Sequence, residues 1–200
     1  STLDGTLFPY TTLFRSEAMK NAGLPFSKGE PRTQTLIKLA NSSQRSHAKF
    51  LRQIMICFNI TASGMFMKEF DTYKIGTTRM SSSTMHTLLN KPLDYDNFSF
   101  YNIYNSEYDI PLEQEFKKVL DAIIDFDRKV LQSNSSDIEK LMLVKSVIPE
   151  SFKYNSYITM NYEVLRTMYH DRKNHRLPEW KMFLESFESI PYFNEFIKGE

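Results

Sequence analysis

The strongest pattern in the sequence is the segment PLEQEFKKVLDAIIDFDRKVLQ, residues 111–132. Its apolar residues recur every three to four positions, at Leu112, Phe116, Val119, Ile123 and Val130 or Leu131. This spacing places them on one face of an α-helix. Because such a helix is stabilised mainly by burying its apolar face, the segment predicts a packed core rather than a disordered chain.

The remaining patterns predict further helices and two strands. Helices are expected at 31–40, after a cap at Thr61, from Asp137 to about Val147, at 161–171 and from Pro178. Ser136 and Glu139 have the spacing of a capping box at the start of the third of these helices. Apolar and β-branched runs predict strands near Gln53 to Ile60 and at 154–160. Residues 75–110 predict a long connection with short strands, and such loops are often functional.

The first residues, STLDGTLFPYTTLFRS, carry two competing resemblances. LDGTLF resembles the Asp-x-Asp-Gly-Thr-Leu opening of haloacid dehalogenase-type phosphohydrolases, but Thr2 stands where the nucleophilic Asp is needed. Thr6 to Ser16 instead reads, codon for codon, as the translation of a common short-read sequencing adapter. We therefore interpret residues 1–16 as a non-native, adapter-derived segment of a metagenomic gene, and 17–200 as a single domain.

Composition narrows the classes of function. A net charge of +1 does not favour a nucleic-acid polymer as partner, and the longest apolar run, IMICFNI, is too short to span a membrane. With only 6 Gly, the chain has no phosphate-binding loop of either nucleotide-binding type. The four His and the single Cys57 lack metal-ligand spacing, so no metal is expected. The lone Cys also suits a reducing cytoplasm.

A long-range pattern is more specific. Lys145 lies four residues before Pro149, Asn161 follows the predicted second strand, and Arg172 lies further along the next helix. This order resembles the carboxy-terminal half of the flavin-dependent thymidylate synthases. Upstream, the family's run from a His to its Arg-His-Arg signature matches His47, Ala62, Glu69 and Lys74 in ungapped register. Beyond a one-residue insertion near Arg79, Ser83 matches the loop's Ser. The resemblance covers about residues 44–190.

The resemblance implies an α/β (α+β) fold, a single domain of helices packed on a small, mainly antiparallel sheet. It also implies reductive methylation of a deoxyuridine monophosphate by FAD, with NADPH and methylenetetrahydrofolate as co-substrates. The chemistry belongs to the cofactor, so no side-chain nucleophile is expected. The family implies a homotetramer with sites between chains, in the cytoplasm of a bacterium or a phage-infected host.

The family's site residues carry over by position. The nucleotide would be bound by Glu69, Lys74, Ser83, Lys145 and Arg172. The flavin would be contacted by His47, Thr72, Tyr73, Asn161 and His175. We therefore predict that Lys145, Arg172 and Ser83 converge on the phosphate, and that His47 and Asn161 share a cleft with Lys74.

The chain also departs from the family. Thr72-Tyr73-Lys74 replaces the Arg-His-Arg signature, and Met80 and Met85 stand where the signature has its Asn and final Arg. Arg to Lys keeps the charge but loses the planar fork that grips a phosphate with two bonds. A second interpretation is therefore a non-catalytic relative that keeps the fold and binds a nucleotide or a protein partner.

Overall fold

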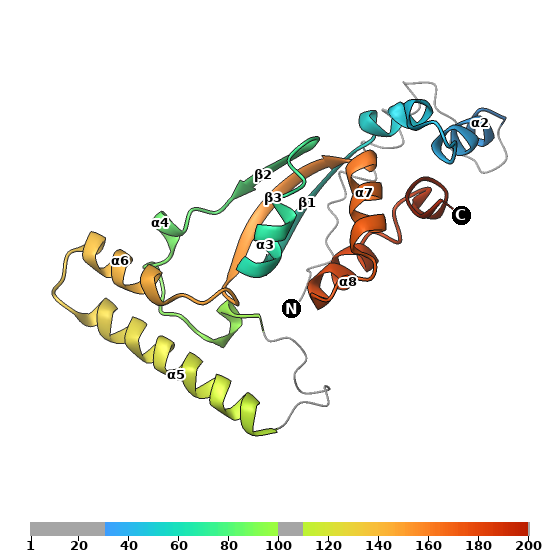
Figure 1. The fold of residues 1–200 in the computed structure, drawn as a ribbon. Helices are drawn as coiled ribbons and strands as arrows, with labels where there is room; N and C mark the ends of the chain where they lie inside the picture. The colour runs from blue at the N-terminus through green and yellow to red at the C-terminus, as the bar shows by residue number, and fades with distance from the viewer. Residues whose placement is uncertain (1–30, 100–109, 200) are drawn as a thin grey trace. The chain divides into compact units, whose positions relative to one another are not determined.

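A computed structural model describes residues 31–99 and 110–199, so the interpretation of residues 1–16 lies outside the described residues. The elements, in chain order, are α2 (Pro31–Ala40), η1 (Arg45–Gln53), β1 (Met55–Ser63), α3 (Gly64–Phe70), β2 (Thr77–Ser81), α4 (Thr84–Thr87), η2 (Tyr95–Asn97), α5 (Ile110–Gln132), α6 (Asp137–Val147), β3 (Lys153–Asn161), α7 (Tyr162–Arg172), α8 (Pro178–Glu185) and η4 (Phe193–Lys198). Figure 1 shows these elements along the chain. No helix in the described ranges is both long enough and apolar enough to cross a membrane.

The three strands form one small sheet in the order β1-β3-β2 (Figure 1). Tyr162 N donates to Ile54 O at 3.0 Å, and Gly64 N donates to Phe152 O at 3.0 Å, which sets β1 antiparallel to β3. In the same register, Cys57 Sγ lies 3.3 Å from Thr159 Oγ1 across the two strands. The predicted fold class, α+β with helices on a small antiparallel sheet, is confirmed.

The contacts divide the described chain into two compact units, which we describe separately. The first unit holds residues 62–67, 81–99 and 110–155, and the second holds 31–61, 68–80 and 156–199. Strands β1 and β3 each pass from one unit into the other along the chain. The prediction of a single domain stays a prediction.

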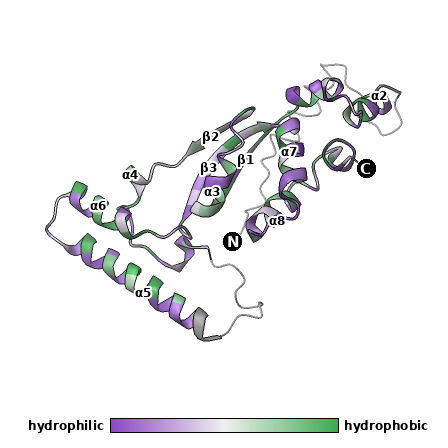
Figure 2. Ribbon diagram, in the orientation of Figure 1, coloured by the Kyte–Doolittle hydropathy of each residue, from purple (hydrophilic) through white to green (hydrophobic). Residues whose placement is uncertain are grey.

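The core of the first unit lies where α5 meets α6. Leu120, Ile124 and Val130 of α5 are buried together with Leu141 and Val144 of α6. Figure 2 shows hydrophobic and hydrophilic residues alternating around α5. The helix is confirmed, but its buried face is not entirely the expected one, because Val119 is 54% exposed and Leu120 is 0% exposed. The buried face of α5 is therefore shifted by one residue from the predicted one, because α6 packs on the side that carries Leu120.

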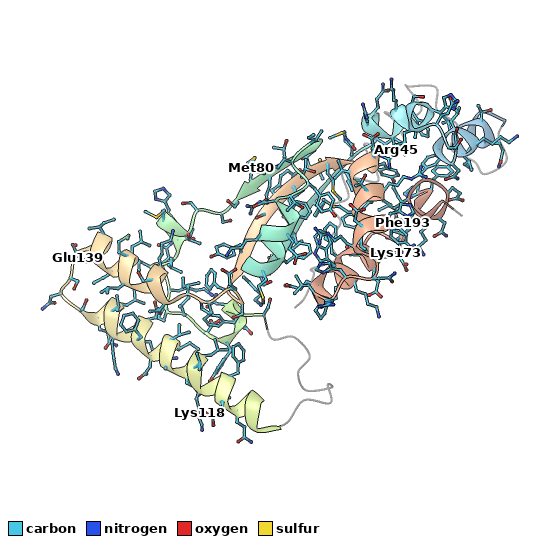
Figure 3. All side chains as sticks on the ribbon, in the orientation of Figure 1. Arg45, Met80, Lys118, Glu139, Lys173 and Phe193 are labelled. Atoms are coloured by element: carbon cyan, nitrogen blue, oxygen red, sulfur yellow. The ribbon has the colours of Figure 1, made fainter. Side chains whose placement is uncertain are left out.

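The cap of α6 is the one that the sequence predicts. Ser136 N donates to Glu139 Oε2 at 2.9 Å, and Glu139 N donates to Ser136 Oγ at 3.4 Å. Glu139 is marked in Figure 3 near the beginning of the helix. The Ser136 hydroxyl, at 2.7 Å, and the Ser136 backbone N–H both donate to the Glu139 carboxylate, and these two hydrogen bonds hold the pKa of the Glu139 carboxyl below its ordinary value. Both partners lie within four residues, which is why the sequence reveals the cap.

The core of the second unit is aromatic. Phe58 of β1 contacts Phe187 at 5.1 Å between ring centroids, and Phe183 of α8 contacts Phe187 at 5.0 Å. Phe70, at the end of α3, packs on Phe183 at 5.8 Å. Phe193, labelled in Figure 3, packs on Tyr169 of α7 at 5.8 Å, so η4 lies against α7. The many aromatic residues of the sequence therefore build core in this unit.

Two boundaries differ from the expected ones. The strand expected near 53–60 runs to Ser63, so Thr61 lies inside β1 and does not cap the next helix. The buried Ser63 Oγ accepts a hydrogen bond from Phe66 N at 3.1 Å and takes that role. The π-helical turn η4 and the 3-10 helix η1 have no distinct pattern in the sequence.

Candidate functional site

Glu69 and Arg172 meet in the second unit. Glu69 lies in the last turn of α3, and Arg172 is the last residue of α7. Arg172 Nη1 donates to Glu69 Oε2 at 3.0 Å. Arg172 Nε donates to the Tyr73 hydroxyl at 2.8 Å. The family resemblance implies nucleotide binding for Glu69 and Arg172 and flavin contact for Tyr73, and the structure joins these three residues in one hydrogen-bonded group.

Trp180 and His175 complete this group. The Trp180 side chain is 0% exposed, and its Nε1 donates to Glu69 Oε2 at 2.8 Å. His175 Nε2 lies 3.2 Å from the same oxygen. The Arg172 guanidinium carbon lies 5.0 Å from the Trp180 ring centroid and 5.5 Å from that of Tyr73, within cation-π range. We call Glu69, Tyr73, Arg172, His175 and Trp180 the arginine cluster.

Sequence reasoning missed Trp180. It is the only Trp of the chain, and it directly follows the Pro178-Glu179 start of α8. A buried indole N–H needs an acceptor, so a single Trp near the start of a core helix is a signal for a polar partner. The sequence does not say that this partner is Glu69, which is 111 positions away.

The Tyr73 hydroxyl is engaged on both sides. It accepts from Arg172 and donates to Asp171 Oδ2 at 3.3 Å. Burial raises the pKa of the Tyr73 hydroxyl, while the neighbouring Arg172 opposes that rise. The group is therefore a neutral hydrogen-bonding hydroxyl near pH 7.

The two neighbours of Tyr73 have different surroundings. Thr72 Oγ1 donates to the Glu69 carbonyl at 2.7 Å and closes the turn after α3. Lys74 is exposed. Of the segment that replaces the family signature, only Lys74 presents a positive charge to solvent.

Asn161 and His47 lie on different elements of the second unit. Asn161 is buried and caps α7, its Oδ1 accepting from Val164 N at 3.0 Å. His47 is exposed on η1, with Nδ1 3.1 Å from Ser42 Oγ. Their predicted meeting at a flavin cleft with Lys74 stays a prediction.

Ser83 and Lys145 lie in the first unit. Ser83 is exposed and precedes the short helix α4. Lys145 Nζ donates to Thr84 Oγ1 at 3.2 Å, so the lysine reaches the residue next to Ser83. The convergence of this pair with Arg172 stays a prediction.

A pocket of about 190 Å³ in the first unit adjoins this pair. Its polar wall consists of hydroxyl, amide and ammonium groups, from Ser82, Thr84, Thr87, Lys91, Asn97, Lys153 and Asn155. Phe152 and Tyr154 supply an aromatic wall. Hydroxyls and ammonium groups are the donors that an anionic group needs. Within the ranges 31–99 and 110–199, no three His, Cys, Asp or Glu side chains are arranged to hold a metal ion.

Comparison with known proteins agrees with this architecture at the level of fold. The chain has the fold of the flavin-dependent thymidylate synthases. It is similar to two crystal structures of the enzyme ThyX from Helicobacter pylori, each with FAD and dUMP. One matches with a TM-score of 0.59 and 15% identity over 98% of this chain and 94% of that chain. The other matches with a TM-score of 0.62 and 17% identity over 100% of this chain and 94% of that chain. No protein-family model and no curated protein sequence matches the chain.

Proposed function

We propose that this chain is a flavin-dependent thymidylate synthase that binds FAD and methylates deoxyuridine monophosphate reductively. Methylenetetrahydrofolate would donate the carbon and NADPH the reducing equivalents. The observation that carries the proposal is the fold, which this chain shares over 94% of the length of two proteins crystallised with FAD and dUMP. In this proposal the protein is a cytoplasmic homotetramer of a bacterium or a phage-infected host.

The donor groups of the second unit fit a planar, partly anionic cofactor. Tyr73, which is partly exposed, offers an aromatic ring beside the Arg172 guanidinium, and such groups stack on flat heterocycles. The flavin would be held by His47, Thr72, Tyr73, Asn161 and His175. Bound there, it would supply the hydride chemistry that side chains cannot.

The nucleotide needs cations and hydroxyls. Arg172 has a fork geometry suited to a phosphate, and Lys74, Lys145 and Ser83 add donors that match the family's positions. The polar pocket beside Ser83 and Lys145 supports an anionic ligand in this region. The task of these residues is to bind and orient the nucleotide, since positioning and fixed charges are the protein's main means of accelerating such a reaction.

One observation favours the second candidate, a non-catalytic relative that binds a nucleotide or a protein partner. Thr72 and Tyr73 replace the first two signature residues, and the hydroxyls of both form hydrogen bonds within the chain. Arg172 is likewise paired with Glu69. Fewer groups are therefore presented to a ligand than the family's Arg-His-Arg would present.

The deciding experiment combines flavin binding and turnover. The purified protein is incubated with FAD, and bound flavin is measured by its visible absorbance after gel filtration. Formation of thymidylate from dUMP is then assayed with NADPH and methylenetetrahydrofolate. Bound flavin with turnover supports the synthase, and binding without turnover supports the non-catalytic relative. A protein that binds neither ligand contradicts the synthase and the nucleotide-binding form of the relative.

Arg172 can be tested separately. We expect Arg172→Ala to weaken dUMP binding by about 2 to 4 kcal/mol, the scale for losing one partner of a charged pair. Arg172→Lys should recover only part of this, because the fork is lost. The exposed Arg176 is the control, and Arg176→Ala should bind dUMP as the unmodified protein does. Equal affinities of all the proteins in calorimetric titration would contradict the assignment of Arg172.

A further inference from the structure

Glu69 places one carboxylate oxygen at the centre of the arginine cluster. Arg172 Nη1 at 3.0 Å, Trp180 Nε1 at 2.8 Å and His175 Nε2 at 3.2 Å all lie within reach of Oε2. An oxygen with this many N–H partners is held firmly, since hydrogen bonds to an ionised acceptor are roughly twice as strong as neutral ones.

The hydrogen bonds of His175 show which of these partners carries the charge. His175 Nδ1 accepts from Leu177 N at 3.1 Å, so this nitrogen has no proton. The proton is therefore on Nε2, which faces Glu69, and the ring is neutral. Trp180 is also a neutral donor. Arg172 is then the cation that balances Glu69 within the cluster.

Arg172 is largely committed inside the chain. Its Nη1 is bound by Glu69 and its Nε by Tyr73, and its side chain is only 21% exposed. The Glu69 side chain is 36% exposed, so a ligand that reaches Arg172 also meets the carboxylate. Two like charges that share one cation repel each other, and the repulsion is strongest where water is partly excluded.

We propose that Glu69 is a specificity-determining residue, an internal competitor that weakens the binding of a phosphate dianion at Arg172. The inference rests on the proposed function, because it takes the phosphate monoester of the nucleotide as the ligand of Arg172. A phosphate bound to the guanidinium must compete with the carboxylate for this cation, and where the exchange is complete Glu69 is left with two neutral donors. A nucleoside without phosphate does not need this exchange.

Glu69→Gln is the informative variant. It removes the charge and keeps an amide oxygen that can accept from Trp180 Nε1, so the buried indole N–H stays bonded. Glu163→Gln is the matched control, because Glu163 pairs with Arg52 at 2.6 Å in the same unit and on the opposite end of α7 from Arg172. Glu69→Asp is the second variant, which keeps the charge but shortens its reach.

The experiment titrates dUMP and deoxyuridine into each full-length protein by calorimetry, with FAD binding and thermal unfolding measured in parallel. We expect Glu69→Gln to bind dUMP about tenfold more tightly, which corresponds to about 1.4 kcal/mol. Deoxyuridine affinity should be unchanged, Glu163→Gln should match the unmodified protein, and Glu69→Asp should lie between. If Glu69→Gln does not fold, a dUMP affinity of Glu69→Asp above that of the unmodified protein is the result that supports competition by Glu69.

Other outcomes overturn the inference. An unchanged dUMP affinity in Glu69→Gln, or in a folded Glu69→Asp where Gln fails, shows that Glu69 does not compete. Loss of deoxyuridine binding shows that Glu69 orients the base instead. If the proteins bind FAD but not dUMP, the proposed competition by Glu69 is wrong, but the proposal that the chain binds a flavin is not contradicted. If they do not bind FAD, the proposed function itself is contradicted.

Discussion

Gly76 lies so close to Asn161 that a methyl group on its α-carbon would be 2.8 Å from Asn161 Nδ2 and 2.9 Å from Val164 Cγ2. Its φ of +80° is in the left-handed region that favours glycine. The turn between α3 and β2 is thus packed against the start of α7. This contact connects the segment after Lys74 with a predicted flavin residue.

We expect Gly76→Ala to destabilise the protein by about 1 to 3 kcal/mol, because both the backbone conformation and the space exclude a side chain. The free energy of unfolding in denaturant measures the loss. Gly199→Ala is the control, since φ is +84° there but the nearest atom is an exposed Asn41 oxygen at 3.2 Å. If the free energy of unfolding falls equally in both variants, crowding by Asn161 does not contribute to the destabilisation.

Asn161 has a structural role that can be separated from its predicted contact with the flavin. Asn161→Ala removes the cap of α7 and should cost about 1 kcal/mol in unfolding free energy. Asn161→Asp keeps an oxygen for Val164 N and should retain this stability. If the amide also binds the flavin, only FAD affinity falls in the Asp variant. Equal destabilisation of the two variants would argue against the cap.

Asp127 makes the stability of the first unit depend on pH. Its side chain is 0% exposed; Oδ2 accepts from Leu93 N at 2.8 Å, whereas Oδ1 has no hydrogen-bond partner in the described residues. Burial raises the pKa of the Asp127 carboxyl above its ordinary value of 3.8, while the Leu93 N–H and Arg128 oppose the rise. The folded state therefore favours the protonated acid.

The raised pKa of Asp127 determines how the stability of the protein changes with pH. The stability contributed by protonated Asp127 is fully present below the unfolded pKa and is lost as pH rises through the folded pKa. Relative to Asp127→Asn, the unmodified protein should therefore become less stable as pH rises from about 4 through the folded pKa of Asp127. Unfolding curves over this range measure the difference. Asp125→Asn is the control, because Asp125 is exposed on the same helix, and its curve should run parallel to that of the unmodified protein.

The side of α5 that faces the core can be tested with two adjacent residues. Leu120→Ala should lose about 2 to 5 kcal/mol, because it leaves a cavity in the core of the first unit. Val119 is 54% exposed, so Val119→Ala should change stability by at most about 0.5 kcal/mol. If Val119→Ala loses more unfolding free energy than Leu120→Ala, the buried face of the helix is the one predicted from the sequence.

Features set by neighbours in the chain could be predicted from the sequence. The Ser136–Glu139 capping box, the start of α8 at Pro178 and the extent of α2 each depend on residues within one or two helical turns. The periodicity of 111–132 likewise identifies a helix, since an amphipathic face repeats locally. The family resemblance, read from the spacing of residues such as Asn161 and Arg172, anticipated the fold that the structure confirms.

Only the tertiary structure decided what lies against these elements. Arg172 meets Glu69 103 positions away, and Trp180 meets it 111 positions away, through no local motif. The same holds for Val119 and Leu120, whose burial depends on where α6 packs. By itself, the sequence determined the longer helices and the strands β1 and β3, but not η1 or η4, and it supplied the candidate site residues apart from Trp180. Which side chains pair was decided by long-range packing, because burying a polar group stabilises the fold only when a distant partner arrives in hydrogen-bonding geometry.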